Sequence, residues 1–504
     1  MKTVRILLID VNRISLDTSI DMLEYPLGLV YVSAAIKKEF GDRVEVGIRS
    51  FNDKVDSEET VHAWLEEFKP EIVGLRSLTM GRKPLHAIAN LAKSWGASLV
   101  VAGGPHATDS PQDVLDNEAF DCAVLGEGEE TAVDLVLHYM DGKSLDCVKG
   151  IAVRGPDGKA IENWRPPNLD PDRIPTPDHR LVDFQGINRY KMDFSFRYNV
   201  PHANLFTSRG CPYRCIYCHH VFGKKFRAHS AERIMAEIQA LHDQFGITRF
   251  QIIDDIFNLD KPRAMKLFDL ICGSGLKLVL SFPNGVRGDL VDEEMVDAMW
   301  EAGVRYMAYA VETASPRMQK LIKKNLNLER IARAISLSTE KGIVTRGFFM
   351  TGFPTETEEE ANLTVEFAKS SDLVLALFFA VVYFPGTALY RLAHEMTHFS
   401  GFDLGLDEDY VRLREGPYAF SRKTLEDLKL KAIREFFFSP KRIKLCFEKM
   451  PNFYDQRDID NSILVNIISG SMEEDDIEEE NCREKLHRHF LIAKRFSKKS
   501  GFFV

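Results

Sequence analysis

The sequence of 504 residues contains no long hydrophobic run. No stretch approaches the roughly 18 apolar residues that a membrane-spanning helix needs. The first residues, "MKTVRILLIDVNR", hold an apolar run of about six residues followed by an acidic one, which is too short for a secretion signal. We therefore expect a cytoplasmic protein without a transmembrane segment.

Cysteine is scarce, and an excess of basic charge is absent. Eight cysteines in a long chain without a secretion signal do not make a disulfide scaffold, so a reducing compartment is favoured. The formal net charge of −10 argues against nucleic-acid binding, because a phosphate-binding surface is normally basic. The sequence also shows no internal repeat. No nucleic-acid partner is expected.

Short β-branched runs alternate with helical patterns in residues 1–150. The strand candidates are residues 4–9, 44–50, 71–77, 98–104 and 121–126. Strands that repeatedly lead into helices predict a parallel sheet covered on both faces, that is, a doubly wound (Rossmann-like) α/β domain. Such sheets bind ligands beyond the carboxyl ends of their strands. The segments "RSLTMG", "GGPHAT" and "LGEGEE" occupy those ends, which makes Ser77, Gly103 and Gly104 candidate binding residues.

A proline- and aspartate-rich segment within residues 151–200, "NWRPPNLDPDRIPTPDHR", predicts a linker or strap. Residues 201–397 then alternate again, with strand candidates at 203–208, 248–254, 276–282, 305–311, 344–351 and 375–383. Six strand–helix units are fewer than the eight of a closed barrel and predict a partial (β/α)6 barrel. Residues 398–504 are expected to be a helical C-terminal region, and an amphipathic helix there more often packs on a core than on a lipid surface.

Three of the eight cysteines lie within "CPYRCIYC", at Cys211, Cys215 and Cys218. They follow the first strand of the second alternation, at the strand end where barrel active sites assemble. Three kinds of site fit this spacing: a zinc site completed by His219 or His220, a redox pair from Cys215 and Cys218, and a 4Fe-4S cluster held by three thiolates. Only the cluster leaves one metal atom without a protein ligand.

The C-x-x-x-C-x-x-C spacing, with Tyr217 before the third cysteine and a six-unit barrel behind it, resembles the radical S-adenosylmethionine (radical SAM) superfamily. The resemblance implies that S-adenosylmethionine binds the open iron and is cleaved reductively to a 5′-deoxyadenosyl radical. It also implies roles for single positions. Asp254 or, as the preferred candidate, Asp255 would face the methionyl ammonium, Glu312 would lie near the ribose or amino group, and the backbone at Gly352 would lie against the adenine.

The first domain, with "YPLGLVYVSAAI" at residues 25–36 and "GGPHAT" at residues 103–108, resembles the cobalamin-binding domain of cobalamin-dependent radical SAM enzymes. The resemblance covers residues 1–397 and implies cobalamin as a third cofactor. The D-x-H-x-x-G signature of an axial histidine is absent, since "DVNRIS" follows the first strand. His106 is a lone histidine, which more often satisfies hydrogen bonds than binds a metal.

The resemblance implies a cobalamin-dependent methyltransferase acting on an unactivated carbon of a small or lipid-like molecule. Two alternatives remain open: a radical enzyme that cyclises, couples or rearranges its substrate without methyl transfer, and a non-catalytic corrinoid or iron-sulfur binding protein. The expected partners are a small-molecule substrate and an external electron donor such as flavodoxin or ferredoxin.

Overall fold

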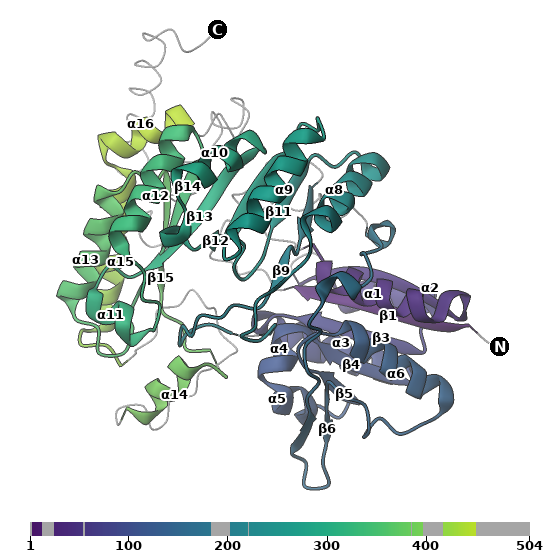
Figure 1. Cartoon of the computed structure of the whole chain (residues 1–504). Coiled ribbons are helices and arrows are strands. Elements are labelled where there is room, and N and C mark those ends of the chain that lie inside the picture. Colours follow the sequence, from purple (N-terminus) through teal and green to yellow (C-terminus); the bar gives the residue numbers. More distant parts are fainter. Residues whose placement is uncertain are drawn as a thin grey trace.

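A computed structural model shows two α/β units side by side, one formed by the N-terminal third of the chain and one by the middle (Figure 1). It describes residues 3–12, 25–53, 56–182, 202–219, 221–384, 386–396 and 417–449. The predicted fold class is confirmed, because both units contain parallel strands that alternate with helices.

The N-terminal sheet has seven strands in the order β2-β1-β3-β4-β5-β6-β7. The first five are parallel, as predicted: β1 (Val4–Asn12), β2 (Val44–Asn52), β3 (Ile72–Ser77), β4 (Leu99–Gly103) and β5 (Cys122–Val124). The antiparallel β6 (Ile151–Arg154) and β7 (Ala160–Asn163) extend the sheet. These two strands lie in the segment that the sequence analysis assigned to a linker, so the sheet continues past residue 150.

Both faces of this sheet are buried, which follows from the alternation along β1. Ile6 and Leu8 belong to the core on the side of α1 (Leu27–Phe40) and α6 (Glu129–Asp141). Leu7 and Ile9 point to the other side, toward α2 (Glu58–Phe68) and α3 (Arg82–Trp95). Two short helices, α4 (Gly104–Asp109) and α5 (Pro111–Asp116), follow β4. The carboxyl ends of the parallel strands are therefore the edge of the sheet that remains available to a ligand.

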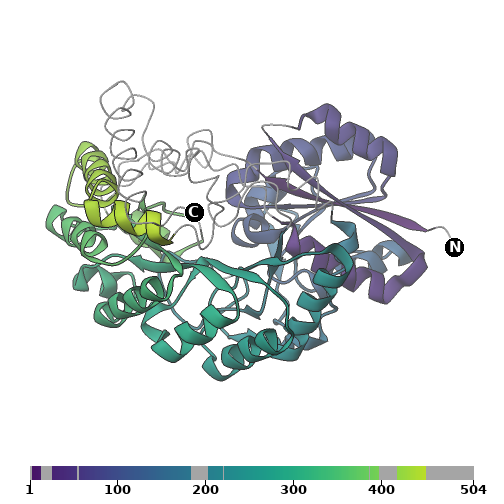
Figure 2. The same cartoon turned by 90° about the horizontal axis from the view of Figure 1, so that it is seen from above.

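The second unit is an open barrel of six parallel strands in chain order: β8 (His202–Leu205), β11 (Arg249–Ile252), β12 (Val279–Val286), β13 (Val304–Glu312), β14 (Val344–Thr351) and β15 (Leu375–Ala380). Figure 2 shows the strands as an arc with helices along its outer side. These helices are α8 (Ala231–Phe245), α9 (Lys261–Gly273), α10 (Glu293–Glu301), α11 (Pro316–Leu321), α12 (Leu328–Lys341) and α13 (Glu358–Ser370).

Capping residues define where the barrel helices begin and end. At the start of α8, the Ser230 side chain accepts a hydrogen bond from the Arg233 backbone, and Gly246 ends the helix with a positive φ of 66°. Thr357 and Glu360 form a capping box at the start of α13. Such caps satisfy backbone groups that a helix end leaves unpaired. They fix the lengths of the helices and, through them, the positions of the strand ends.

The chain continues after the barrel with α14 (Ala388–Glu395), α15 (Arg422–Phe437) and α16 (Pro440–Lys449). Helix α15 packs on β15, where Phe436 makes an edge-on contact with Phe378 at 6.1 Å between ring centroids. The packing expected for the amphipathic segment is thus confirmed for residues 422–449. The rest of the predicted helical region, including the basic tail at 495–504, lies outside the described residues. None of the described helices is both long and apolar enough to cross a membrane.

Candidate active site

The three cysteines lie on a loop held between two short antiparallel strands, β9 (Ser208–Arg209) and β10 (Arg227–Ala228). We call residues 210–226 the cysteine loop. It leaves β9 through Gly210, which has a φ of 80°. A Cβ atom on Gly210 would lie 2.4 Å from the Lys225 carbonyl oxygen, so the tight return of the loop requires glycine.

The middle of the cysteine loop is anchored in a small apolar core. Ile216 is buried with residues of α11 and α14, among them Met318 and Leu389. The Ile216 backbone N–H donates to the Ile322 carbonyl at 3.0 Å, and its carbonyl accepts from the Leu389 N–H at 2.8 Å. These two contacts anchor the loop at Ile216, although the described residues of the loop form no regular secondary structure.

The arrangement of the three sulfur atoms argues against a single zinc ion. Ligand atoms bound to one zinc at about 2.3 Å lie less than about 4.6 Å apart. In the described part of the chain, the one group of three or more His, Cys, Asp or Glu side chains with all ligand atoms within 4.8 Å of one another does not contain these cysteines. The hydrogen bond from Cys218 and the charge of Lys324 lower the pKa of the Cys215 thiol, against the effect of burial. Burial raises the pKa of Cys211, and the hydrogen bond with Cys215 raises the pKa of Cys218, so the thiolate form is favoured at Cys215 alone.

Tyr217, Glu312 and Lys324 form a buried polar group behind the cysteines. Glu312 ends β13 with a φ of 67°, an unusual conformation for a residue other than glycine. Its Oε1 accepts hydrogen bonds from the Tyr217 hydroxyl at 3.2 Å and from Lys324 Nζ at 3.3 Å. Sequence reasoning singled out Tyr217 and Glu312 but missed Lys324. Burial lowers the pKa of Lys324. The negative charges of Glu312 and the cysteines outweigh burial, so the pKa lies above its usual value.

The structure separates the two aspartates at the end of β11. Asp254 is buried and accepts hydrogen bonds from the Thr207 backbone at 2.7 Å and the Ser208 hydroxyl at 2.6 Å, so it holds the start of β9 in place. Asp255 lines the cavity described below. The Asp255 side chain is exposed to the cavity, but the surrounding protein desolvates it, and this desolvation, followed by the neighbouring charge of Asp254, raises its pKa to about 6. Of the two candidates, Asp255 is the one placed to meet a ligand.

Gly352 follows β14 with a φ of 100°, which favours glycine. Its N–H donates to Glu356 Oε2 at 2.5 Å, and its carbonyl accepts from the Tyr383 hydroxyl at 2.7 Å. Glu356 is fully buried, and burial raises its pKa to about 7. Sequence reasoning missed Glu356, whose carboxylate fixes the turn in which Gly352 lies.

A cavity of about 620 Å³ lies between the N-terminal sheet and the barrel. On the sheet side, it extends as an apolar slot between the strands and helices α1 and α6, lined by Ile6, Leu8, Ile72, Leu99, Val101 and Leu135. On the barrel side, it is lined by His219, Phe222 and Asp255. The cysteine loop and the carboxyl edge of the sheet therefore face the same space.

Gly103 and Gly104 line this cavity, as expected for binding residues, whereas Ser77 does not. Gly104 has a φ of 85°, and a Cβ atom there would lie 2.8 Å from Arg76 Cγ. The Ser77 hydroxyl donates to the Val11 and Leu78 carbonyls at 2.9 Å and ties the end of β3 to β1. Arg76, which sequence reasoning missed, lines the cavity and donates to the buried Asp10 at 2.9 Å. A charged residue at the end of a buried strand is the signal that could have identified it.

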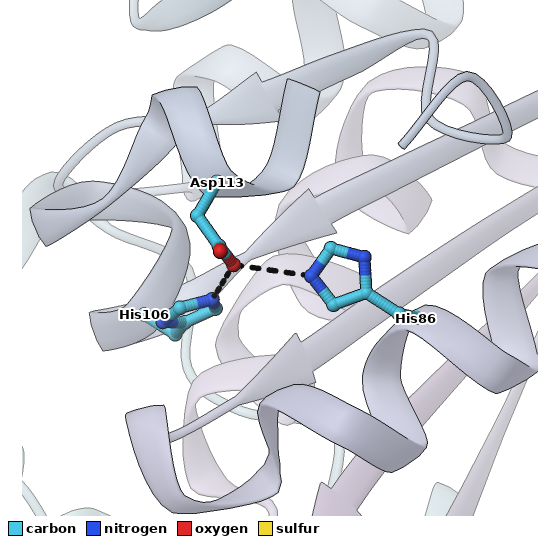
Figure 3. Close-up of side chains that lie close together, drawn as sticks. All are labelled: His86, His106 and Asp113. Carbon is cyan, nitrogen blue, oxygen red and sulfur yellow. Dashed lines mark hydrogen bonds and ion pairs between the residues drawn. The ribbon is translucent and has the colours of Figure 1, made fainter. Parts of the chain in front are cut away.

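His106 does not line the cavity and lies among polar side chains of α3, α4 and α5, where its Nε2 is bonded and, within the described residues, its buried Nδ1 has no hydrogen-bond partner. Asp113 on α5 accepts from His106 on α4 at 3.0 Å and from His86 on α3 at 3.1 Å (Figure 3). The guanidinium of Arg82 binds the same carboxylate at 2.7 Å. Its positive charge opposes a metal cation at this position, so we assign the group a structural role in bracing the helices behind Gly103 and Gly104.

A buried ion-pair network joins the two units beside the cavity. Arg209, which directly precedes Gly210, is 2% exposed. Its guanidinium contacts Glu127 in the loop that follows β5 at 2.9 Å and Glu129 at the start of α6 at 2.6 Å. Glu127 also binds Arg227 at 2.6 Å. We call these four residues the interdomain ion-pair network, and it attaches β9 and β10 to the wall of the cavity.

A second polar contact between the units lies at the cavity itself. His219 Nδ1, next to Cys218, lies 2.5 Å from Asp109 Oδ2 at the end of α4. Both residues line the cavity, together with Phe384, whose ring packs edge-on against His219 at 5.1 Å between centroids. The cysteine loop is thus positioned against the N-terminal sheet from two sides.

Comparison with known proteins agrees with this geometry. Residues 16–136 match the family model described as the B12 binding domain, and residues 205–368 match the radical SAM superfamily. An uncharacterized methyltransferase of Pyrococcus horikoshii is 32% identical over 375 residues, which cover 73% of this chain and 78% of the relative. The chain belongs to the cobalamin-dependent radical SAM enzymes. The expected family and enzyme class are therefore confirmed.

Two further similarities support the assignment to the cobalamin-dependent radical SAM enzymes. The cytidylyl-2-hydroxyethylphosphonate methyltransferase of Streptomyces wedmorensis is 30% identical over 417 residues, which cover 73% of this chain and 77% of that protein. The solved structure of the radical S-adenosylmethionine methyltransferase TsrM from Kitasatospora setae superposes with a TM-score of 0.65 and 20% identity, covering 77% of this chain and 76% of that one. The latter similarity concerns the fold.

The residues of this radical SAM enzyme fit the three cofactors of the family. The cysteine motif supplies three thiols and no fourth ligand. A 4Fe-4S cluster that binds S-adenosylmethionine needs three protein ligands and one iron left open. The apolar slot is a recess that cobalamin could enter, and the turn at Gly103 and Gly104 would let it approach the backbone closely. The roles of single residues, Tyr217, Asp255, Glu312, Gly352, Gly103 and Gly104 among them, stay predictions.

Proposed function

We propose that this protein is a cobalamin-dependent radical SAM methyltransferase that adds a methyl group to an unactivated carbon. The observation that carries the proposal is the shared cavity: His219 and Phe222 of the cysteine loop line the same space as Gly103 and Gly104 of the N-terminal sheet. Relatives named as methyltransferases support the same reaction. A radical formed at one wall and a methyl carrier held at the other would meet one substrate between them.

The bound cofactors would supply the one-electron chemistry and the methyl group. The chain would position them and exclude water. Cys211, Cys215 and Cys218 would hold the cluster. Glu312, which pairs with Lys324 at 3.3 Å, would accept hydrogen bonds from S-adenosylmethionine. Asp255 would attract the methionyl ammonium across the cavity.

An apolar inner wall of the barrel supports a substrate with an apolar part. On β14 and β15, Phe349 and Phe378 are buried against each other, with ring centroids 5.3 Å apart; Phe349 packs on Phe367 of α13 and Phe378 on Phe436 of α15. The alternation of strand side chains places Phe348 and Phe379 on the opposite, inner face. Phe379 remains 46% exposed, and its ring lies 6.2 Å from that of Phe348. We propose that this pair contacts the substrate.

A reducing cytoplasm and an external one-electron donor of the flavodoxin or ferredoxin type complete the proposal. The cluster requires reduction before each cleavage of S-adenosylmethionine, and within the described residues no second cysteine group is present that would hold another cluster. We propose that this electron comes from another molecule.

The test is an anaerobic turnover assay of the protein reconstituted with iron, sulfide and hydroxocobalamin. A chemical reductant and S-adenosylmethionine should yield both 5′-deoxyadenosine and S-adenosylhomocysteine, the latter from remethylation of the corrinoid. Replacing all three cysteines by alanine should abolish 5′-deoxyadenosine and leave corrinoid binding intact. 5′-Deoxyadenosine without S-adenosylhomocysteine would instead favour cyclisation or rearrangement.

A further inference from the structure

The barrel side of the cavity contains a pair of buried amide side chains. Asn204 on β8 and Gln251 on β11 lie directly opposite each other in the register of these two parallel strands. Both residues line the cavity between the two units. Neighbouring strands are about 4.8 Å apart, so one small group in the cavity could contact both amides.

The alternation of side chains along the strands explains why these two amides face the cavity. Ala203 and Leu205 flank Asn204 on β8, and Phe250 precedes Gln251 on β11. These apolar neighbours belong to the core that α8 and α9 cover. Because successive side chains of a strand point to opposite faces, Asn204 and Gln251 point to the inner face of the barrel.

The protein leaves part of each amide without a partner. Asn204 is 8% exposed and Gln251 is 6% exposed. Within the described residues, Asn204 Oδ1 and Gln251 Nε2 are buried and have no hydrogen-bond partner. A buried polar group without a partner costs stability, and most buried polar groups are therefore paired. An unpaired acceptor and an unpaired donor side by side in a cavity wall indicate a ligand that pairs with both.

The row of side chains to which the two amides belong carries no charge. Gln251 lies opposite Ser281 of β12, whose buried hydroxyl also lacks a hydrogen-bond partner in the part of the chain that the structure describes. Charged residues that line the cavity, such as Arg76 and Asp255, lie near the ends of strands β3 and β11. A buried ion needs a counter-charge, so this row favours a neutral ligand.

We propose that Asn204 and Gln251 form a binding site for a neutral carboxamide. The carboxamide N–H would donate to Asn204 Oδ1, and its carbonyl would accept from Gln251 Nε2. A carboxamide carries a donor and an acceptor side by side, which matches this pair. The inference rests on the proposed function, because it assigns the carboxamide to one of the two molecules that would share the cavity: the substrate, or the corrin ring, whose rim carries carboxamide side chains.

The inner wall of the barrel also indicates what a carboxamide substrate would look like. Phe379 is on β15, and Asn204 is on β8, at the opposite end of the strand order. Both residues lie on the inner face. A substrate that contacts both walls would combine a carboxamide with an apolar body. Benzamide, a carboxamide on an aromatic ring, combines the two features in a small probe.

The test measures benzamide binding to the full-length protein by ligand-observed nuclear magnetic resonance, with and without bound hydroxocobalamin. Asn204→Leu/Gln251→Met removes both amides and nearly keeps their shapes. Asn284→Leu is the matched control, because Asn284 also lines the cavity but its amide already donates to the Ile253 carbonyl at 2.9 Å. Benzoate is the charged comparison, with the same shape as benzamide.

We expect benzamide to bind the cofactor-free wild type more tightly than benzoate does. The double variant should raise the dissociation constant of benzamide about tenfold or more, because two hydrogen bonds to buried atoms are lost. Asn284→Leu should change it by less than about threefold. Equal benzamide affinities for the double variant and the wild type, tighter binding of benzoate, or no binding of benzamide would overturn the proposal.

Hydroxocobalamin distinguishes the two sources of the carboxamide. If the loaded protein still binds benzamide, the site is left for the substrate. If hydroxocobalamin displaces benzamide, and the double variant binds hydroxocobalamin about tenfold less tightly than the wild type does, a carboxamide of the corrin occupies the site. Displacement of benzamide without weaker binding of hydroxocobalamin by the double variant would contradict both sources.

The melting temperature separates a binding role of the two amides from a structural one. Replacing an unpaired buried amide by an apolar group of the same shape is neutral or stabilising, so the double variant should melt at or above the wild-type temperature. A lower melting temperature would contradict the proposal, because the amides would then hold the fold together. None of these measurements requires turnover, so a failure of methyl transfer would refute the proposed function and leave this test intact.

Discussion

Replacing Arg209 by methionine should strongly destabilise the folded protein. Methionine has a similar length and keeps the contacts that the arginine stem makes, but it removes the charge from the interdomain ion-pair network. Glu127 retains Arg227 at 2.6 Å. Glu129, whose side chain is 9% exposed, loses the guanidinium at 2.6 Å and becomes a buried carboxylate without that counter-charge. Breaking a buried pair on one side costs about 3–5 kcal/mol, and we expect a loss of this size in the free energy of unfolding.

The pH dependence of the loss follows from Glu129. In the wild type, burial raises the pKa of Glu129, but the charge and hydrogen bond of Arg209 outweigh it and lower the pKa below 4.5. The stabilisation is therefore fully present above about pH 4.5 and is lost as the pH falls through the lowered pKa. Without Arg209, burial is opposed only by a backbone hydrogen bond and by His229, so the pKa of Glu129 rises and its ionisation opposes folding at higher pH. The difference between variant and wild type should grow as the pH rises above 4.5.

The assay is urea unfolding of the cofactor-free protein, followed by tryptophan fluorescence at several pH values. Arg165→Met is the matched control, because Arg165 pairs with Glu130 and Asp134, whose side chains are 58% and 42% exposed. An exposed pair contributes about 0–1 kcal/mol. Adding Glu129→Gln to Arg209→Met should restore part of the stability. A loss below about 1 kcal/mol for Arg209→Met, or no recovery with Glu129→Gln, would refute the reasoning.

Three further outcomes follow from the site. Because the pKa of Glu356 is raised to about 7 from 4.5, the free energy of unfolding should fall by up to about 1.4 kcal/mol per pH unit as the pH rises between these values. Glu356→Gln should flatten this slope in melting temperatures measured against pH, and an unchanged slope would contradict the prediction. Glu312→Gln leaves the buried Lys324 ammonium without its carboxylate and should weaken S-adenosylmethionine binding about tenfold or more in equilibrium titrations, with unchanged iron content; unaltered affinity would remove Glu312 from the site. Gly104→Ala forces a positive φ on a residue with a Cβ atom, at a cost of about 1–3 kcal/mol, and should reduce the cobalamin retained after gel filtration, whereas full retention would show that the turn does not contact the corrin.

The sequence predicted the regular parts of the fold because their signals are local. All eleven predicted parallel strands, five in the N-terminal sheet and six in the barrel, are present in the expected order. The two antiparallel strands β6 and β7 escaped prediction. Each is four residues long, and β7 has no buried residue, so the hydrophobic pattern on which strand prediction depends is missing.

For the candidate site, too, the sequence predicted the residues that belong to a local motif and missed those that depend on distant partners. The cysteine spacing and the glycine at the end of β4 are motifs that a sequence displays. Lys324, Arg209 and Asp109 act through partners 12, 82 and 110 positions away or from another unit of the fold, and nothing in the flanking sequence indicates those partners. Ser77 lies at a strand end, which suggested a ligand contact; its hydroxyl donates to the Val11 and Leu78 carbonyls and does not line the cavity, and its role as a binding residue stays a prediction.

The central claim is that the iron-sulfur cluster and the corrinoid face one common cavity. Electron paramagnetic resonance of the protein loaded with both cofactors tests it directly, because reduced cluster and cob(II)alamin each carry an unpaired electron. The account predicts that reducing the cluster broadens the cob(II)alamin signal and speeds its relaxation through magnetic interaction. Two signals that each match the spectrum of protein carrying a single cofactor would contradict it.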